Sequence, residues 1–359
     1  MLSTVAVPAD EMPEPAAVPC IVCGGRACTV VCTGAEIAAQ LAFLRRFHRH
    51  RLRVADADAL AERAEFTHDE TPAVAACCSC GQLFRNLRRR NAAVRAEYAG
   101  DSYGGDRLAS LFAAQRQLFR GKVARLARVL AGTPQPQIVE IGSFVGGFLA
   151  AAREQGWAAV GIDPGEEVTA FCRAQGLEVQ RNTADEAAID PRSVDCVAIW
   201  NTFDQLPDPR PALRAARRWL KRDGLLVVRV PNGAVFRAAA HALHRLDHRL
   251  RAPLLIALAW NNLLGFPYLQ GYRLDTLDRL LGELDFARCE AVPDMLVRLS
   301  DEHTRAWAVW EEAASKRLWR LIAWRRPRAA PWFDAYYRLA ADGRDVMPIP
   351  TPVPALAAV

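Results

Sequence analysis

Two short cysteine motifs near the start of the chain have the spacing of a metal site. Cys20 and Cys23 form one C-x-x-C-G sequence, and Cys77 and Cys80 form a second. Each pair can present two thiolates to one ion, while the following glycine relieves crowding where backbone amides turn toward sulfur. Four thiolates suit a tetrahedral Zn²⁺ and leave no open coordination position, so we expect a structural zinc ion.

The remaining cysteines leave alternatives open. The ten cysteines of the chain could instead be buried free thiols, and Cys28, Cys32 or Cys78 could replace one of the four ligands. Each C-x-x-C-G turn is called a knuckle here. Cys78 lies inside the second knuckle and should point away if Cys77 and Cys80 both bind the ion. The long stretch between the knuckles contains "FLRRFHRHRLRVADADALAERAEFTHDE", which predicts a mostly helical insertion.

A second motif, "VEIGSFVGG" at 139–147, reads as a strand, a glycine turn and the start of a helix. A dinucleotide site needs G-x-G-x-x-G, whose second glycine lets the backbone approach a pyrophosphate, and here Phe144 stands at that place. The ligand is therefore not a dinucleotide. A ligand with an adenosine and no phosphates would still use the turn, with Asp163 after the next strand for the ribose hydroxyls. Glu140 would be available to a cationic or amino-acid moiety.

Alternating apolar runs and amphipathic helices must position these residues. Such alternation predicts a parallel, doubly wound sheet that binds its ligand at the carboxyl ends of the strands. The expected strands are 136–142, 158–163, 177–181, 194–200 and 225–230, and the expected helices are 107–130, 146–155, 166–175 and 209–221.

These motifs, in this order, resemble the class I S-adenosylmethionine-dependent methyltransferases over roughly 107–300. The matching stretches are "VEIGSFVGG", "VGIDPG" and "SVDCVAIWNTFDQLPDPRPALRAARRWLKRDGLLVVRVPNG", with Asp195 opening a strand and a turn at 221–224. The paired C-x-x-C-G motifs and "EYAGDSYGG" at 97–105 resemble the subgroup with an N-terminal zinc-binding module. The resemblance implies a Rossmann-like α/β fold with a seven-stranded methyltransferase sheet, and S-adenosylmethionine as cofactor.

The resemblance also implies cofactor-binding residues. The first strand would hold the methionine and ribose end, the second the ribose and one side of the adenine, the third-strand loop the adenine edge, and the fourth strand the transferred methyl. The residues of the first strand and its turn are Glu140, Gly142, Ser143, Phe144 and Gly146, and those after the second strand are Asp163 and Pro164. The residues of the third-strand loop are Thr183, Ala184 and Asp185, and those at the end of the fourth strand are Trp200 and Asn201. The glycines could instead only permit tight packing, and Asp163 could cap the following helix.

The catalytic candidates follow from the chemistry of methyl transfer, an in-line displacement that needs an acceptor held against the methyl group. An oxygen or carbon acceptor also benefits from a base. Relatives carry an E-H pair where this chain has Asp204 and Gln205, so another group would have to replace that His. We expect the helical insert 234–270, with His241, His244 and His248 at helical spacing, to cover the acceptor. The candidates are Asp204, Gln205, His241 and Tyr268. Asp204 could instead cap the next helix, His241 could lie on a solvated helix face, and Tyr268 could be a core aromatic.

Composition and length bound the remaining expectations. The net charge is +6, and nearly all of the positively charged residues are arginines. The cluster "LRRFHRHRLR" at 44–53 predicts an amphipathic helix with a solvated basic face. An RNA or anionic-lipid patch is the alternative for this cluster. No signal peptide opens the chain, so we expect a cytoplasmic protein, and the apolar run 252–266 is too short to span a bilayer.

The expected organisation has a disordered start, two folded units, a helical extension and a disordered tail. The boundaries are 1–17, disordered; 18–100, zinc-binding module with the helical insertion; 105–300, methyltransferase domain; 301–345, helical extension; and 346–359, disordered. The Trp-rich extension should pack on the domain or on a second copy of the chain, as in a homodimer.

The expected function is methyl transfer from S-adenosylmethionine to a small molecule, a sugar or another secondary metabolite, at oxygen or carbon. We expect no nucleic-acid partner, although an RNA methyltransferase is one alternative to this function. A non-catalytic scaffold that binds the cofactor is the other.

Overall fold

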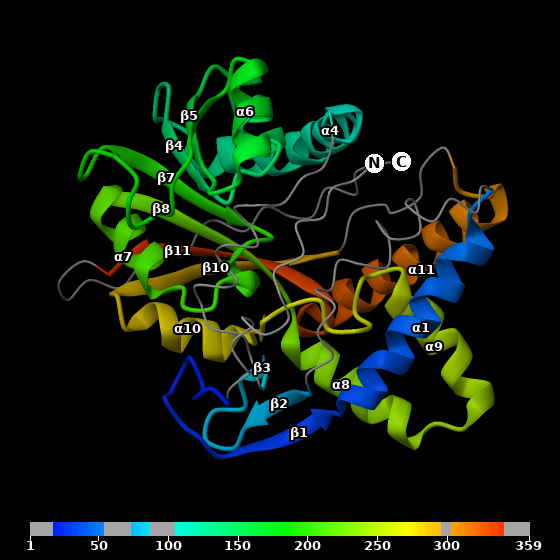
Figure 1. Ribbon diagram of the computed structural model, residues 1–359. Helices are drawn as coiled ribbons and strands as arrows, with labels where there is room; N and C mark the ends of the chain where they lie inside the picture. Colours follow the sequence, from blue (N-terminus) through cyan, green and yellow to red (C-terminus); the bar gives the residue numbers. More distant parts are fainter. Residues whose placement is uncertain (1–16, 54–72, 87–104, 296–302, 341–359) are drawn as a thin grey trace, which may run out of the picture.

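A computed structural model describes residues 17–53, 73–86, 105–295 and 303–340, which form two sheets and the helices around them (Figure 1). The larger sheet has seven strands in the order β10-β11-β8-β7-β4-β5-β6, which confirms the predicted methyltransferase sheet. Its strands are β4 (Gln137–Ile141), β5 (Ala158–Ile162), β6 (Glu178–Gln180), β7 (Val194–Trp200), β8 (Leu220–Pro231), β10 (Phe286–Asp294) and β11 (Trp332–Leu339).

The strands from β8 to β6 are parallel, as the strand-helix alternation predicts. A parallel strand in the middle of such a sheet is covered on both faces, so it reads as a continuous apolar run. The strand β7, "VDCVAIW", is such a run and has the predicted bounds. The other end of the sheet is antiparallel, because β11 pairs with both β8 and β10 in that sense.

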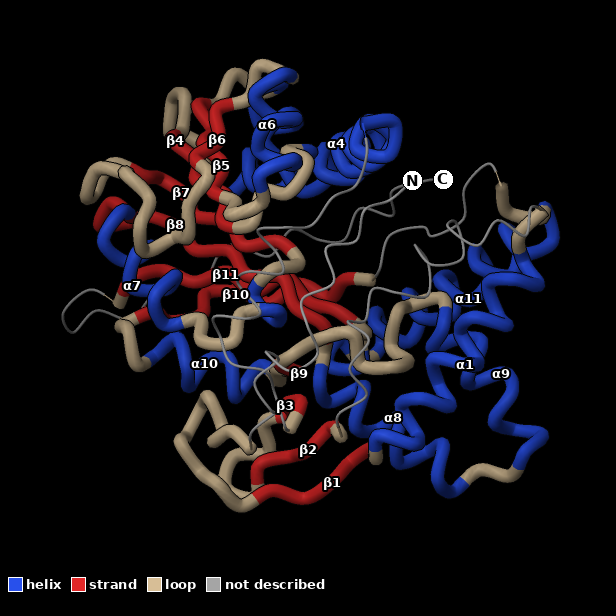
Figure 2. The backbone as a smooth tube through the Cα atoms, viewed as in Figure 1, coloured by secondary structure: helices blue, strands red, loops and turns tan. Residues whose placement is uncertain are grey.

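Helices cover both faces of this sheet (Figure 2). On one face, Phe119 of α4 and Phe148 of α5 pack on Ile138, Trp200 and Val227 of the strands. On the other face, α7 and α10 bury their apolar residues against the same strands. The helices of these two layers are α4 (Gly105–Val129), α5 (Gly147–Glu154), α6 (Glu166–Ala174), α7 (Arg210–Trp219) and α10 (Leu274–Gly282).

The family motif at Asp195 and Lys221 lies at the amino end of the strands. Lys221 Nζ donates to Asp195 Oδ1 at 2.8 Å, and the backbone amide of Gln137 donates to Asp195 Oδ2 at 2.9 Å. These bonds tie together the starts of β4, β7 and β8. The motif therefore holds the sheet and takes no part in a site at the carboxyl ends.

The smaller sheet belongs to the cysteine-rich module and has the order β1-β2-β3-β9. Its strands are β1 (Cys28–Cys32), β2 (Val74–Cys77), β3 (Leu83–Arg85) and β9 (Gln270–Gly271). Because β9 comes from the loop before α10, this sheet joins the N-terminal module to the larger domain through backbone hydrogen bonds.

A corner of four helices stands beside the module (Figure 1). Its core includes Phe47, Phe236, Trp260 and Ala308. The basic stretch 44–53 lies at the end of α1, which confirms the predicted helix there, whereas the insertion beyond Arg53 lies outside the described residues. The four helices are α1 (Gly34–Arg51), α8 (Gly233–Arg245), α9 (His248–Ala259) and α11 (Ala306–Arg325).

The C-terminal segment differs from the helical extension expected over 301–345. The helix α11 ends at Arg325, and after a short 3-10 turn (Pro327–Ala329) the strand β11 enters the sheet between β8 and β10. In the sequence of this strand, "WFDAYYRL", Phe333, Ala335 and Tyr337 alternate onto the α10 face. This period of two identifies a strand. The predicted disordered ends, 1–17 and 346–359, lie outside the described residues except for Ala17.

Truncation tests the role of β11. A chain that ends at Pro331 removes a central strand and exposes the edges of β8 and β10, so we expect it to lose cooperative thermal unfolding. A chain that ends at Asp345 keeps the strand and should unfold at the temperature of the full chain. Equal melting curves for the two truncations would contradict the placement of β11.

Candidate cofactor and acceptor site

Buried polar atoms lie at the carboxyl ends of β4 and β6. Glu140 Oε2, Ser143 Oγ and Thr183 Oγ1 are buried, and none has a hydrogen-bond partner within the described residues. Burial, with the charge of Asp163, raises the pKa of Glu140 well above its ordinary value. Buried polar atoms normally have partners, so three such atoms along one edge fit a polar ligand. A cationic ligand group would also favour the ionised form of Glu140.

The glycine turn after β4 keeps a left-handed backbone at the position where Phe144 replaces glycine. Gly142 and Gly146 have φ values of 76°, and Phe144 has a φ of 46°. The amide of Phe144 donates to Asp163 Oδ2 at 2.8 Å, and its carbonyl accepts from Cys172 Sγ at 3.2 Å. These bonds hold Phe144 in a conformation that costs a non-glycine residue about 1 kcal/mol, so the turn keeps its shape.

The glycines themselves allow parts of the protein to approach one another. A Cβ at Gly146 would lie 2.5 Å from Leu177 Cδ1, and one at Gly142 would lie 2.2 Å from Thr202 Oγ1. The alternative of tight packing therefore applies to both positions. Thr202 follows β7, so Gly142 brings the ends of β4 and β7 together at the site.

Asp163 accepts two backbone hydrogen bonds. Its Oδ2 binds the amide of Phe144, and its Oδ1 binds the amide of Gly165, which caps α6, at 2.9 Å. Gly165 is the N-cap residue of α6 and Asp163 lies two residues before it, so the alternative that Asp163 caps this helix is wrong. Both hydrogen bonds are compatible with ribose binding, because a carboxylate oxygen can accept more than one hydrogen bond. The structure places Pro164 half-buried beside it, Ala184 buried and Asp185 exposed in the loop after β6.

At the end of β7, Trp200 and Asn201 point in different directions. Trp200 is buried, with its ring packed on Phe119 and Phe148, so its side chain belongs to the core. Asn201 is exposed and has a left-handed backbone with a φ of 54°. Of this predicted pair, the structure therefore presents only the side chain of Asn201 at the surface.

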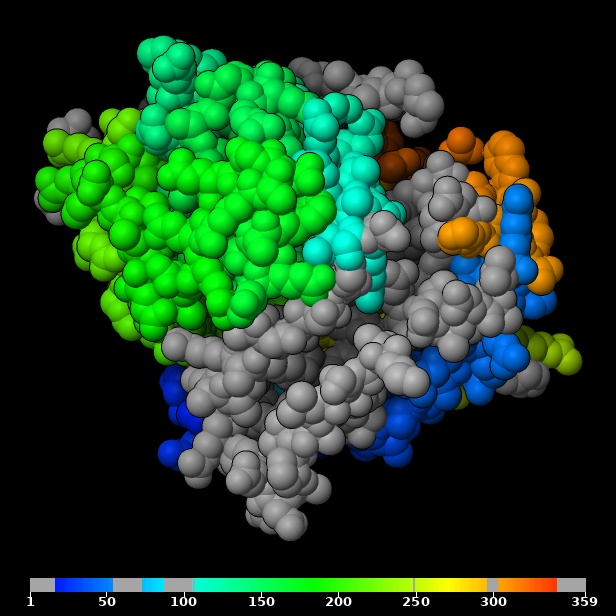
Figure 3. All heavy atoms as spheres, turned by 45° about the horizontal axis from the view of Figure 1, so that its top comes forward, coloured from blue at the N-terminus to red at the C-terminus, as the bar shows by residue number. Residues whose placement is uncertain are grey.

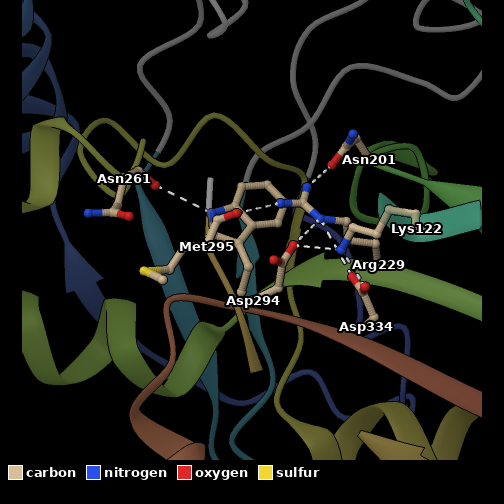
Figure 4. Close-up of polar contacts among 8 residues, drawn as sticks. Lys122, Asn201, Arg229, Asn261, Asp294, Met295 and Asp334 are labelled. Atoms are coloured by element: carbon tan, nitrogen blue, oxygen red, sulfur yellow. Dashed lines mark hydrogen bonds and ion pairs between the residues drawn. The ribbon is translucent and has the colours of Figure 1, made fainter. Parts of the chain in front are cut away.

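A network of charges, in which Arg229 and Asp334 are buried and Lys122 and Asp294 half-buried, holds Asn201 in place (Figure 4). Arg229, beside Trp200 on β8, donates to Asn201 Oδ1 and, at 2.8 Å, to Asp294 Oδ2. Lys122 of α4 binds Asp294 at 2.9 Å and also Asp334. Burial opposes ionisation of Asp294, but Arg229 and Lys122 outweigh it and hold its pKa well below the ordinary value. Sequence reasoning did not select Arg229, although an arginine inside the apolar run "LLVVRV" was a visible signal.

Three of the four catalytic candidates lie together beside this network. Asp204 is buried, its Oδ2 accepts from Gln205 Nε2 at 3.0 Å, and its Oδ1 has no hydrogen-bond partner within the described residues. Burial raises the pKa of Asp204 to about 7, against the opposing effects of its own backbone amide and of Arg229. Gln205 also donates to Pro267 O at 2.9 Å, and the backbone amide of Leu269 donates to Asp204 O at 3.1 Å.

Tyr268 completes this group. Its hydroxyl donates to Asn262 O at 2.6 Å, and its ring packs edge-on against Trp332 with centroids 5.7 Å apart. The Arg229 guanidinium lies 4.3 Å from the centre of the Trp332 ring. Trp332 at the start of β11 was missed because the expected helical extension concealed the strand.

The fourth candidate, His241, is not part of the group. It is exposed on α8, and His244 binds Glu36 Oε1 at 2.7 Å. Asp247 caps a new helix at His248, so the three histidines do not share one helix face. The sequence "RLDH" carried this signal, since an Asp before a helical run is a typical N-cap.

Comparison with protein families agrees with this geometry. Residues 112–290 match a family model described as a methyltransferase domain. Residues 112–290 thus form a methyltransferase domain. No curated protein matches it. Within the described part of this methyltransferase, no helix is long and apolar enough to cross a membrane.

Solved methyltransferase structures resemble the chain at low sequence identity. A SAM-dependent methyltransferase from Archaeoglobus fulgidus is 16% identical, with a TM-score of 0.41, over 62% of this chain and 94% of that one. The plantazolicin methyltransferase BpumL, solved with SAH, is 12% identical, with a TM-score of 0.42, over 70% of this chain and 95% of that one. The CcbJ methyltransferase from Streptomyces caelestis is 13% identical, with a TM-score of 0.40, over 62% of this chain and 90% of that one. All three TM-scores lie below 0.5, so the acceptor of this chain does not follow from these structures.

The four cysteines that the sequence predicts as metal ligands lie together in this methyltransferase. The sulfur atoms of Cys20, Cys23, Cys77 and Cys80 all lie within 4.8 Å of one another, and the Cys20–Cys80 and Cys23–Cys77 pairs are 3.5 Å apart. Thiolates about 2.3 Å from a tetrahedral zinc have similar spacing, so these four residues could hold the ion.

The knuckle glycines and the other cysteines agree with this ligand set. Gly24 and Gly81 have left-handed φ values of 71° and 73°, and their amides close the two knuckles onto the carbonyls of the first cysteines. Cys78 is exposed, as expected for a residue that points away. Cys28 and Cys32 lie on β1, outside the group of four.

The metal module positions the acceptor loop through Arg85, a buried residue at the end of β3. Arg85 Nε donates to Phe266 O at 3.1 Å and to Tyr268 O at 3.0 Å, and its Nη2 donates to Gly265 O at 3.0 Å. Cys20 and Cys77 pack in the same core as the larger sheet. Zinc bound at the knuckles would therefore stabilise the loop that carries Tyr268.

Substitution of the cysteines tests the ligand set. We expect Cys77→Ser to remove bound zinc and lower the melting temperature, because the knuckle, β3 and the Arg85 contacts lose their anchor. Cys78→Ser, one residue away, should keep one zinc per chain and the original melting temperature. Elemental analysis and thermal unfolding of the purified variants measure both effects. Zinc loss from the Cys78 variant alone would show that the ligand set is wrong.

Proposed function

We propose that this methyltransferase transfers the methyl group to a small molecule, a sugar or another secondary metabolite, at a hydroxyl or an acidic carbon. The observation that carries the proposal is the carboxyl of Asp204. It is buried, has a pKa of about 7, and has one oxygen without a hydrogen-bond partner in the described structure. A general base acts best when its pKa lies near the working pH.

The bound cofactor supplies an electrophilic methyl group. Asp204 accepts the proton that leaves the acceptor hydroxyl or carbon as the new bond to the methyl group forms. Gln205 Nε2 holds one carboxylate oxygen of Asp204, which leaves the other oxygen for the acceptor. In this way Asp204 fulfils the role of the missing His, and Gln205 positions it.

The residues around Asp204 favour a polar acceptor with a ring. Tyr268 and Trp332 are buried aromatic side chains whose rings pack against each other, and Asn201 provides an exposed amide at the end of β7. Polar groups between aromatic walls are typical of sites for small organic ligands. The fixed placement of Asn201 by Arg229 supports an orienting contact to the acceptor.

The basic stretch 44–53 offers less support for RNA than its sequence suggests. Arg51 is buried, lies 3.6 Å from the centre of the Phe47 ring and pairs with Glu311 at 2.7 Å. His48 is also buried. Part of the cluster therefore stabilises the helical corner, and a methyltransferase for RNA remains the alternative outcome of the experiment below.

Label transfer tests the class of acceptor. Purified, zinc-loaded protein is incubated with methyl-tritiated S-adenosylmethionine and cell extract, which is then separated into small-molecule, RNA and protein fractions. We expect label in the small-molecule fraction, in amounts that grow with time. Label in RNA would contradict the proposal, and label in no fraction despite cofactor binding would favour the scaffold.

The pH dependence of turnover tests the base. Asp204 must be ionised to accept a proton, so the rate should rise as the pH increases through about 7 and then level off, following the raised pKa. Asp204→Asn should lower the rate by about 10²-fold or more and abolish this dependence, with cofactor affinity retained. Asp208→Asn, in the same loop, is the matched control and should keep the profile. An unchanged profile in the Asp204 variant would exclude it as the base.

A further inference from the structure

A stripe of large apolar side chains is exposed on α11. Five of the seven large hydrophobic residues exposed in the described part of the chain lie on this one helix, and the other two are Val30 and Leu250. The five are Trp307, 43% exposed; Trp310, 70%; Leu318, 55%; Leu321, 48%; and Trp324, 67%. We call them the α11 stripe. An exposed apolar patch of this kind marks an interaction surface.

The stripe occupies one face of the helix. Its members follow one another at spacings of three, eight, three and three residues, which lie on one side of an α-helix. The opposite face is buried at Ala308, Glu312, Lys316 and Ala323. The helix is thus packed on the protein by one side and offers the other to a partner.

The charges around the stripe are all of one sign. The exposed charged residues of α11 after its second turn, and of the segment that follows to residue 328, are arginines: Arg317, Arg320, Arg325, Arg326 and Arg328. The two acidic residues of the helix are paired elsewhere, since Glu311 binds Arg51 and Glu312 binds Lys316. The positive charge around the stripe is therefore not offset by an unpaired acidic residue of the described helix α11.

The basic end of α1 lies beside the start of the stripe. The ring centroids of His50 and Trp307 are 5.4 Å apart, and Leu52 forms a β-bridge with Thr304. Figure 3 shows α1 in blue next to α11 in orange at one edge of the molecule. Arg46 and Arg49 are exposed on this part of α1. The stretch 44–53 thus extends the positive surface around the stripe.

These features select among the partners that an apolar helix face can have. Pairing of two copies of this chain through the stripe would bring arginines against arginines, which costs free energy. An amphipathic helix in the interface of an anionic bilayer has this composition: tryptophan and leucine on the buried face and arginine around them. Tryptophan at both ends of a helix is also typical of the headgroup region.

We propose that α11 docks the protein on an anionic membrane surface, with the helix in the plane of the bilayer and the α11 stripe inserted between headgroups. The arginines of α11 and α1 bind lipid phosphates. The proposal concerns peripheral attachment, and it is independent of the acceptor of methyl transfer.

Vesicle binding tests the proposal with the full-length, zinc-loaded protein. Co-sedimentation is measured with vesicles of phosphatidylcholine alone and of phosphatidylcholine mixed with phosphatidylglycerol. We expect binding to the mixed vesicles, weaker binding at high salt, and a blue shift of tryptophan fluorescence on binding. Binding to phosphatidylcholine alone should be much weaker, because the arginines are attracted only to an anionic surface.

Two variants separate the apolar and the charged contributions. Trp310→Ala with Trp324→Ala should weaken vesicle binding by on the order of tenfold or more, since apolar area enters the interface. Arg317→Glu with Arg320→Glu should weaken it by at least about tenfold. Val30→Ala and Arg222→Glu, exposed residues outside α11, are the matched controls and should bind as the unmodified chain does. All variants should keep the same melting temperature, because the substituted side chains are exposed.

Three results would overturn the proposal. The first is an absence of binding to mixed vesicles at low salt. The second is binding that neither pair of substitutions changes. The third is a dimer, or a complex with single-stranded RNA, that the Trp310 and Trp324 substitutions abolish while vesicles are not bound; the stripe would then serve that partner.

Discussion

The guanidinium of Arg85 is a buried charge whose hydrogen bonds go to the backbone carbonyls of Gly265, Phe266 and Tyr268. A buried cation is tolerated only where such acceptors surround it, so the loop and the arginine fix each other. Arg85 ends the short strand that follows the second cysteine knuckle. The cysteine-rich module and the loop 265–268 are therefore joined through Arg85.

The consequences of this constraint extend to Asp204, whose carboxyl we propose as the base. The loop that Arg85 holds also provides the carbonyl of Pro267, which binds Gln205, and the amide of Leu269, which binds the backbone of Asp204. From the other side, the network of Lys122, Arg229, Asp294 and Asp334 fixes the end of β7. The residues around Asp204 are thus held by two independent sets of buried polar contacts, which suits a site that must orient its acceptor.

The sequence was sufficient to predict the parallel half of the sheet, because buried parallel strands are continuous apolar runs that end in glycine or polar residues. The metal centre was equally predictable, since the C-x-x-C-G motif specifies local geometry. The helical extension predicted over 301–345 was wrong at β11. The helix α11 separates Trp332 to Leu339 from the partner strands β8 and β10 along the chain. Pairing between strands so far apart in sequence leaves no local pattern beyond a period of two. The prediction that His241, His244 and His248 share one helix was also wrong. It rested on their spacing alone, whereas the N-cap at Asp247 begins a new helix. Arg229 left a signal as the one arginine in the apolar run 225–230. Arg85 left none, because its importance arises from burial.

The central claim is that the edge formed by β4, β5 and β6 binds S-adenosylmethionine through a glycine turn in which Phe144 replaces glycine. Calorimetric titration of S-adenosylmethionine into folded, zinc-loaded protein tests it most directly, with NAD⁺ as the comparison ligand. The account predicts saturable binding of one S-adenosylmethionine per chain and no binding of NAD⁺, whose pyrophosphate needs the missing glycine. The absence of S-adenosylmethionine binding, or binding of NAD⁺ in its place, would contradict it.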